Sequence, residues 1–339
     1  MLPVMHSRPP KSGIAPPSDS TNLEEGGKGM RTWTVFAKTK DMPKAEWLRL
    51  RRNGIGGSDA AAIMGLNPWR TAMDVWLEKT GEFTRDDEEN EQMYWGTVLE
   101  AVVAEEFTRR TGLKTRRRNA ILQSRKYPFM IANVDRLVVG EPAGLECKTT
   151  GLYNVDDWRI GIPEYYFPQV QHYMAVTGYP VWYVAVLIGG QEYKHYEVPR
   201  DDGFIRELVA AERDFWRRVT EKVPPPIDGT KASTELIQRL YPEAEKGKEV
   251  ELPFEAFELI QLYERACEEE KRIQLIKDEA ANKLKDMLGT AERGSIHGRT
   301  VTWQNVVAKR LDTKALQKEY PDIYERFVRE STYRRFSLK

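Results

Sequence analysis

Residues 133–148, with the sequence NVDRLVVGEPAGLECK, decide the fold and the chemistry that we expect of this chain. Two short apolar runs in it flank a Gly-Glu-Pro turn, which is the pattern of two adjacent strands. Side chains alternate between the two faces of a strand, so Glu146 and Lys148 share one face and Cys147 points to the other. If the two runs pair as a hairpin, Asp135 meets both of them at one end of a sheet.

Composition bounds the size of the protein but does not indicate its partner. The chain has 339 residues, 40% of them hydrophobic, which is enough for one sizeable core and a second unit. Lys plus Arg equals Asp plus Glu at 52 each, so net charge does not point to nucleic acid. Two isolated cysteines form neither a metal-ligand pattern nor a disulfide framework, which favours the cytoplasm. Residues 1–30 lack a secretory signal, and no apolar run approaches the ~20 residues of a membrane span.

Helix and strand patterns divide the chain into four parts. The predicted helices and strands, in order, are helices at 41–52, 59–64, 71–78 and 95–110, strands at 120–123, 129–134, 136–139 and 144–149, a helix at 163–176, a hairpin of 181–188 with 192–198, and a helix at 201–220. This order predicts an α/β layered domain over 39–223. It follows a disordered tail or extension, 1–38, within which Met30 is a candidate start.

The part of the chain after the α/β domain has a different composition. Three consecutive prolines, at positions 224–226, open a predicted linker that extends to 251. Beyond it, 252–339 is a charged, mainly helical region. We expect a long helix at 254–288, a strand at 300–307 and two short helices in 313–329 divided by Pro321.

Two carboxylates beside an ammonium suit the hydrolysis of a phosphodiester. Mg²⁺ prefers oxygen ligands such as Asp135 and Glu146. A bound metal neutralises charge on the transition-state oxygens and generates a nucleophile near neutral pH. Lys148 would then orient or deprotonate the attacking water. The alternative is a salt-bridged hairpin, because these residue types are common on exposed strands.

Two predicted helices supply further candidates. Glu100 lies on an apolar helical face, where a carboxylate needs a partner, either a metal or a neighbouring arginine. Gln169 and Tyr173 are four residues apart and present a polar pair on one face of their helix. His172 is expected to pack within the same helix and not to bind a ligand, and His195 is given no role.

The glycine-rich stretch 51–59, RRNGIGGSD, favours anion binding. Glycines let the backbone approach a ligand closely, and Ser58 is a good N-cap for a helix. A helix N-terminus with Arg51 and Arg52 nearby attracts a terminal phosphate of DNA. The alternative is a capped helix after a glycine turn.

Five segments in this order resemble the YqaJ-type viral recombinase family, the phage lambda exonuclease-like branch of the PD-(D/E)XK nucleases. They are 51–83, 95–100, Asp135, 145–148 and 167–174. The resemblance covers roughly 42–220 and implies a restriction-endonuclease-like core, a central mixed sheet flanked by helices, with a mainly helical C-terminal extension. One position departs from the family: the glycine that usually follows the first carboxylate is Arg136 here, which could add a phosphate contact.

The resemblance also implies a role for each matching position. It implies that Mg²⁺, with Mn²⁺ as a substitute, is bound as two ions by Glu100, Asp135, Glu146 and the backbone carbonyl of Cys147. Lys148 would serve the attacking water, and Gln169 and Tyr173 match the Q-x-x-x-Y motif. Arg51 and Ser58 match positions that hold the 5′-phosphate end.

The activity implied is a 5′-3′ exonuclease that works on double-stranded DNA in phage recombination. It would leave a 3′ overhang for a single-strand annealing protein, act as a ring-shaped homotrimer, and work in the bacterial host cytoplasm. In this context the basic run 109–118 becomes a DNA contact. The full set of expected DNA and 5′-phosphate contacts is Arg51, Arg52, Ser58, Arg116, Arg117, Arg118 and Arg136.

Two other functions stay open on the sequence alone. One is an endonuclease of the restriction or repair type on the same fold, which would cut closed circular DNA. The other is a non-catalytic DNA-binding adaptor. The intact Asp135, Glu146 and Lys148 argue against the adaptor, because a degenerate nuclease would be expected to lose at least one of them.

Overall fold

The computed structural model describes residues 31–82, 91–329 and 332–338, so residues 1–30 of the expected tail lie outside the described residues. The chain forms two compact units, Met1–Leu236 and Ile237–Lys339. Within the described ranges, no helix has the length and apolar character that a membrane crossing requires.

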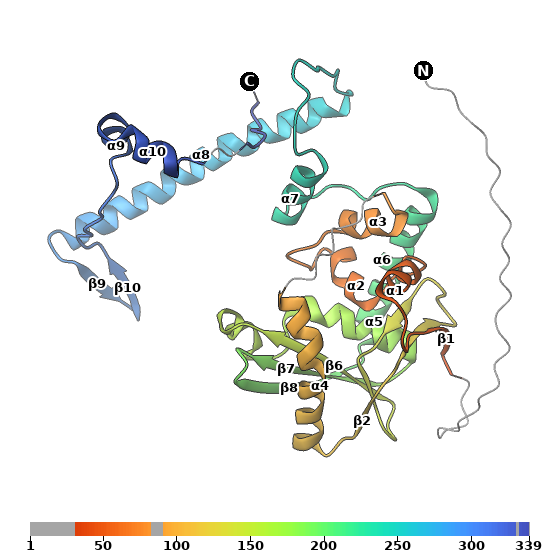
Figure 1. The fold of residues 1–339 in the computed structure, drawn as a ribbon. Coiled ribbons are helices and arrows are strands. Elements are labelled where there is room, and N and C mark those ends of the chain that lie inside the picture. The colour runs from red at the N-terminus through yellow and green to blue at the C-terminus, as the bar shows by residue number, and fades with distance from the viewer. Residues whose placement is uncertain (1–30, 83–90, 330–331, 339) are drawn as a thin grey trace. The chain divides into compact units, whose positions relative to one another are not determined.

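The centre of the first unit is a five-stranded mixed sheet in the order β2-β5-β6-β7-β8 (Figure 1). Its strands are β2 (Thr115–Arg117), β5 (Arg136–Val138), β6 (Ala143–Thr150), β7 (Val181–Ile188) and β8 (Glu192–Pro199). β6 and β7 are parallel, and the other neighbours are antiparallel. A parallel pair requires a crossover connection, and helix α5 (Phe167–Thr177) lies in it.

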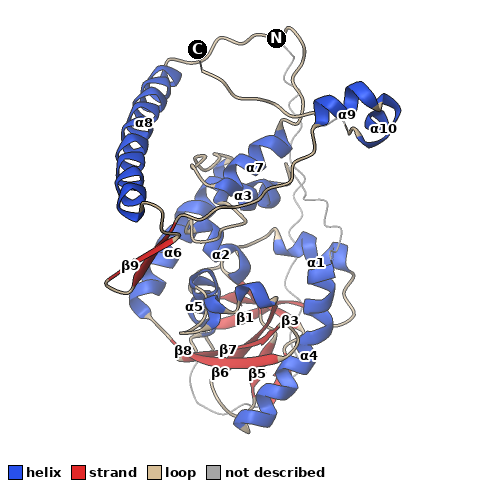
Figure 2. Ribbon diagram, turned by 90° about the vertical axis from the view of Figure 1, so that its left-hand side faces the viewer, coloured by secondary structure: helices blue, strands red, loops and turns tan. Residues whose placement is uncertain are grey.

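Helices α4 (Glu91–Thr111) and α5 cover opposite faces of this sheet, and Figure 2 shows α5 over the strands. Side chains alternate between the two faces of a strand, so neighbouring residues of one strand pack in the layers on opposite faces of the sheet. Leu145 and Ala185 pack in one core cluster with Phe107 of α4. Val184, the neighbour of Ala185 in β7, packs in the other cluster with Met174 of α5. The expected α/β class, a mixed sheet flanked by helices, is therefore confirmed.

A second, three-stranded antiparallel sheet corrects the predicted length of the N-terminal tail. It consists of β1 (Trp33–Lys38), β3 (Ala120–Ser124) and β4 (Ile131–Asn133), in the order β1-β3-β4. The tail expected over 1–38 is therefore too long, because its end pairs with β3. The predicted strands 129–134 and 136–139, on either side of Asp135, form β4 and β5 and belong to different sheets. In addition, the strand β2 forms within the basic run 109–118.

Four further α-helices, besides α4 and α5, precede the proline run. They are α1 (Lys44–Arg51), α2 (Gly57–Ile63), α3 (Ala72–Thr80) and α6 (Asp202–Glu221). The indole of Trp76 in α3 donates a hydrogen bond to the Arg218 carbonyl in α6 at 3.2 Å. Three short 3-10 helices, η1 (Leu152–Asn154), η2 (Asp156–Trp158) and η3 (Glu164–Tyr166), lead from β6 into α5.

The expected linker 224–251 contains a helix, α7 (Lys231–Leu240), which buries Ala232 and Leu236. A linker was expected because of the proline run, but the residues after the prolines form an amphipathic helix whose apolar side chains are buried.

The second unit contains the long helix α8 (Glu255–Leu288), which has no buried residue. The hairpin β9 (Arg293–Ile296) and β10 (Arg299–Thr302) and the short helices α9 (Thr313–Glu319) and α10 (Pro321–Phe327) follow it. The strand predicted at 300–307 therefore forms only over its first residues.

Candidate active site

The β5–β6 hairpin brings two carboxylates together. Arg136 pairs with Leu145 across the hairpin, which places Asp135 beside Glu146. One oxygen of Asp135, Oδ2, accepts a hydrogen bond from the Cys147 backbone N–H at 2.9 Å. Burial and the adjacent Glu146 carboxylate raise the pKa of Asp135 well above its ordinary value. The convergence that the hairpin pattern predicted is present.

Lys148, Gln169 and Tyr173 converge on the same carboxylate. Glu146 Oε1 accepts hydrogen bonds from Lys148 Nζ at 2.6 Å and from Gln169 Nε2 at 2.6 Å. Gln169 Nε2 also donates to the Tyr173 hydroxyl at 2.9 Å. The polar pair predicted on α5 therefore faces β6, and it holds Glu146 in one orientation.

Lys148 is held as an ammonium in this arrangement. Its burial lowers the pKa of Lys148, but the Glu146 carboxylate outweighs this effect, so the pKa lies above its ordinary value. The ammonium also lies 4.7 Å from the centre of the Tyr166 ring. A charged amine donates hydrogen bonds and cannot accept a proton, so of the two roles expected for Lys148, this geometry favours orienting a water molecule.

The Asp135–Glu146 pair fits a divalent cation. Glu146 Oε2 is buried and has no hydrogen-bond partner among the described residues. An unsatisfied buried carboxylate oxygen is costly, and two carboxylates facing each other repel. A hard divalent cation would satisfy that oxygen and neutralise both charges. The Cys147 thiol packs on the α4 side of the sheet, so only its backbone is near the two carboxylates.

Glu100 has a different partner from the one the resemblance implied. Its carboxylate hydrogen-bonds to Arg136 Nη1, and Arg117 Nη2 lies 3.7 Å away. In the ranges that the structure describes, no three His, Cys, Asp or Glu side chains are placed to share a metal ion. Arginine therefore neutralises Glu100 in this structure, and the role of Glu100 as a metal ligand stays a prediction. Arg136 is buried against Glu100, and its expected contact with phosphate stays a prediction.

A cavity of about 200 Å³ opens beside Asp135. Trp47, Arg117 and Arg118 are among the residues that line it. Arg118 also lies over the Trp33 ring at 5.2 Å, which fixes its side chain. Two of the three arginines predicted in the basic run as DNA contacts thus border the carboxylate site, while Arg116 lies on β2 outside the cavity lining.

Arg51 and Ser58 of the predicted anion site lie together, but Ser58 does not cap the helix. Arg51 Nη2 donates to Ser58 Oγ at 2.8 Å, and the guanidinium lies 4.7 Å from the centre of the Trp47 ring. The N-cap of α2 is Gly56, so Ser58 lies inside the helix and the N-cap prediction is wrong. Arg52 follows the end of α1 and is exposed.

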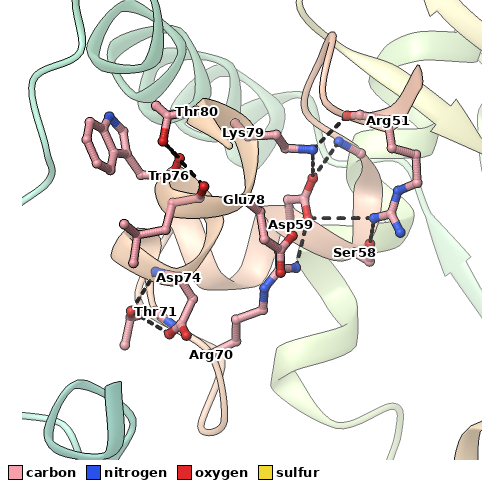
Figure 3. A network of polar contacts seen from close by, with 12 residues as sticks. Arg51, Ser58, Asp59, Arg70, Thr71, Asp74, Trp76, Glu78, Lys79 and Thr80 are labelled. Atoms are coloured by element: carbon pink, nitrogen blue, oxygen red, sulfur yellow. Dashed lines mark hydrogen bonds and ion pairs between the residues drawn. The ribbon is translucent and has the colours of Figure 1, made fainter. Parts of the chain in front are cut away.

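Sequence reasoning missed a charged cluster behind this arginine (Figure 3). Its centre is Asp59, which is completely buried. Asp59 Oδ1 accepts a hydrogen bond from Arg70 at 2.8 Å, and Asp59 Oδ2 lies 2.7 Å from Lys79 Nζ. The sequence indicated this cluster only through an acid near the start of α2, a position where acids are common. Its partners Arg70 and Lys79 come from later segments of the chain.

The histidines of α5 and β8 lie in different environments. His172 is buried, with Nδ1 2.7 Å from Glu212 Oε1 and Nε2 2.9 Å from the Ile131 carbonyl oxygen. It joins α5, α6 and β4 and is a packed helix residue. His195 is exposed on β8, edge-on to the Phe107 ring at 5.8 Å.

The fold and the site together define an α/β protein with a carboxylate, carboxylate and lysine hairpin of the PD-(D/E)XK type. The YqaJ-like viral recombinase domain model matches residues 46–180. The uncharacterized protein YqaJ of Bacillus subtilis (strain 168) is 43% identical over 309 residues, which cover 90% of this chain and 97% of that protein. The chain therefore belongs to the YqaJ-like viral recombinase family.

Solved structures give weaker similarities. An alkaline exonuclease from Laribacter hongkongensis has a TM-score of 0.45 and 18% identity, and the match covers 58% of this chain and 100% of that one. A phage-related exonuclease from Haemophilus somnus 129PT has a TM-score of 0.40 and 15% identity, over 52% of this chain and 99% of that one. The family assignment rests on the YqaJ match and not on these scores.

Proposed function

We propose that this protein is a metal-dependent deoxyribonuclease, a 5′-3′ exonuclease that digests one strand of linear duplex DNA. The observation that carries the proposal is the convergence of Asp135, Glu146 and Lys148 at one hairpin, with Glu146 Oε1 2.6 Å from Lys148 Nζ. Membership of a viral recombinase family supports DNA as the substrate. The product would be a 3′ overhang that a single-strand annealing protein uses.

The two acids of the hairpin would hold the metal. Asp135, Glu146 and the Cys147 carbonyl would bind Mg²⁺, or Mn²⁺ in its place. The ion would supply charge neutralisation at the scissile phosphate and a nucleophile near neutral pH. The described geometry supports one ion, and a second would require Glu100 to exchange its Arg136 partner for metal.

The remaining site residues act by position and hydrogen bonding. Lys148, as an ammonium, would orient the attacking water and stabilise negative charge on the phosphate. Gln169 holds the Glu146 carboxylate through its hydrogen bond of 2.6 Å, and Tyr173 holds Gln169. Such support keeps a site in its productive geometry.

Basic side chains on both sides of the carboxylates would bind the DNA. Arg51 and Ser58 would hold a terminal 5′-phosphate, since a guanidinium and a hydroxyl group both donate hydrogen bonds to phosphate oxygens. Arg117 and Arg118 at the cavity would contact the backbone, and such contacts weaken with salt. We extend the resemblance to a ring-shaped homotrimer in the bacterial cytoplasm, and light scattering of the purified protein tests the trimer.

Digestion of end-labelled linear duplex, with and without a 5′-phosphate, tests the function. Wild type in Mg²⁺ should digest 5′-phosphorylated ends from 5′ to 3′ and spare closed circular DNA, and a chelator should stop it. Arg51→Ala should slow initiation at ends, whereas Lys148→Ala should stop cleavage. Cutting of closed circles would establish an endonuclease instead. Binding without cleavage by wild type in Mg²⁺ or Mn²⁺ would establish an adaptor.

A further inference from the structure

Two buried acids occupy the same position at the starts of consecutive helices. Asp59 is the third residue of α2, and its Oδ2 accepts a hydrogen bond from the N-cap Gly56 N–H at 3.0 Å. Asp74 is the third residue of α3, and its Oδ2 accepts from the Thr71 N–H at 3.0 Å and from the Thr71 hydroxyl at 2.8 Å. Capping explains an acid at this position in both helices.

Capping does not explain the three cations that surround Asp59 (Figure 3). Arg70 Nη1 and Lys79 Nζ are at hydrogen-bonding distance, 2.8 and 2.7 Å from the carboxylate, whereas Arg51 Nη2 lies 3.7 Å away. Lys79 also donates to the Arg51 backbone carbonyl at 2.9 Å, which ties the end of α1 to this cluster. A helix cap needs one carboxylate oxygen and no cation.

The cluster leaves the Arg51 guanidinium within reach of a ligand. Arg70 also bonds Glu78 at 2.5 Å and lies close enough to Asp74 for that carboxylate to raise its pKa, so three cations face three carboxylates. Burial raises the pKa of Asp59, but the cations outweigh it and hold the pKa well below its ordinary value, so the carboxylate stays charged. Arg51 is the least buried cation, with 21% of its side chain exposed. Its hydrogen bond goes to Ser58 and leaves other donors of the guanidinium for a ligand.

We propose that Asp59 is a positioning residue for end recognition: it fixes Arg51 for a terminal phosphate, while Arg70 and Lys79 hold Asp59 in place. The Arg51 guanidinium contacts two groups of the protein. Asp59 lies beside it, and the centre of the Trp47 ring is 4.7 Å from the guanidinium carbon. A donor fixed before binding loses less conformational entropy when the phosphate arrives. This proposal rests on the proposed function, because it assigns a role within the 5′-phosphate pocket.

Asp59→Asn tests the proposal, with Asp74→Asn as the matched control at the same position of α3. Initiation rates on 5′-phosphorylated and 5′-hydroxyl linear duplex give a discrimination ratio for each variant. Asp59→Asn should lower this ratio by about tenfold or more, the effect of a lost charge-assisted interaction, by raising KM for phosphorylated ends. Its kcat should stay within about twofold of wild type, since the hydrolytic residues are untouched. Asp74→Asn should keep the ratio of wild type.

A double substitution separates positioning from a general loss of structure. If Asp59 acts through Arg51, Asp59→Asn should not lower the ratio further in an Arg51→Ala background. Circular dichroism shows whether each variant is folded. Should Asp59→Asn fail to fold, Asp59→Glu keeps the charge but displaces the carboxylate, and it should also lower the ratio.

The outcomes distinguish this proposal from the proposed function. If the wild-type protein does not digest DNA, the nuclease function and this proposal are refuted together. If it initiates equally fast on 5′-phosphorylated and 5′-hydroxyl duplex, the proposed 5′-phosphate pocket is refuted. If wild type discriminates and Arg51→Ala does not, but the folded Asp59 variant keeps the full ratio, only the role of Asp59 is overturned. An equal loss of the ratio in Asp74→Asn would also overturn it, because capping would then suffice.

Discussion

The substitution Asp135→Asn removes one of the two acids that face each other at the hairpin and barely changes the volume of the side chain. Burial and the Glu146 carboxylate raise the pKa of Asp135, so its ionised form is unfavourable in the metal-free fold. Asparagine keeps an oxygen that can accept the Cys147 N–H, which Asp135 accepts at 2.9 Å. The variant should therefore be more stable than wild type without metal, and inactive.

The size of this stability gain depends on pH. Below the ordinary Asp pKa of ~3.9, Asp135 is neutral in both the folded and the unfolded chain, so the free energy of unfolding of the variant equals that of wild type. Above it, the unfolded chain releases the proton more readily than the fold does, so the stability of wild type falls while that of the variant does not. Near neutral pH in a chelator we expect a gain of about 1–2 kcal/mol, or about 2–8 °C in Tm for a unit of this size.

Thermal unfolding between pH 4 and pH 8, in chelator and in Mg²⁺, measures the effect, and DNA digestion is followed in parallel. Mg²⁺ should raise the Tm of wild type and leave that of the variant nearly unchanged. Cleavage by the variant should fall by about a thousandfold or more, since a lost metal ligand removes several kcal/mol of transition-state stabilisation. A variant less stable than wild type at neutral pH in chelator, or one that still cleaves, would refute the reasoning.

Three further predictions follow from single contacts. Lys148→Ala should lose at least about a thousandfold in cleavage while still binding duplex, because it removes a charge aimed at the transition state and no backbone contact; single-turnover digestion and fluorescence anisotropy measure the two properties. Arg117→Gln should lower the slope of log affinity against log salt by about one, and an unchanged slope would remove Arg117 from the DNA contacts. Gly144→Ala should destabilise the fold by about 2–3 kcal/mol in urea, because its Cβ would lie 2.2 Å from the Trp182 ring. Gly161→Ala is the matched control, with nothing within 4 Å of the added Cβ, and an equal loss there would contradict the steric argument.

The carboxylate site could be predicted because its geometry is local. Alternation along β6 places Glu146 and Lys148 on one face. The short turn between β5 and β6 then brings Glu146 beside Asp135. The helical period placed Gln169 and Tyr173 on one face of α5, and both face Glu146. The spacing within each strand or helix is fixed by neighbours within a few residues of the chain, whereas Gln169 meets Glu146 because α5 packs against the sheet.

Relations between distant segments could not be predicted. Glu100 lies 36 residues before Arg136, and on sequence alone an arginine and a metal were equally good partners for its carboxylate. Strand β1 had aromatic and β-branched residues, but its partner β3 begins at Ala120, so nothing local separated it from the tail. Asp59 has an ordinary capping position, and Lys79 reaches it only because α3 folds back against α2.

The central claim is that Asp135 and Glu146 share a divalent cation. A crystal of the protein soaked in Mn²⁺, with data collected at the manganese absorption edge, tests this most directly. The account predicts an anomalous peak in contact with both carboxylates, next to the Glu146 oxygen that has no hydrogen-bond partner among the described residues. A protein that digests DNA in Mn²⁺ but shows its manganese elsewhere, with both carboxylates free of the ion, would contradict the account.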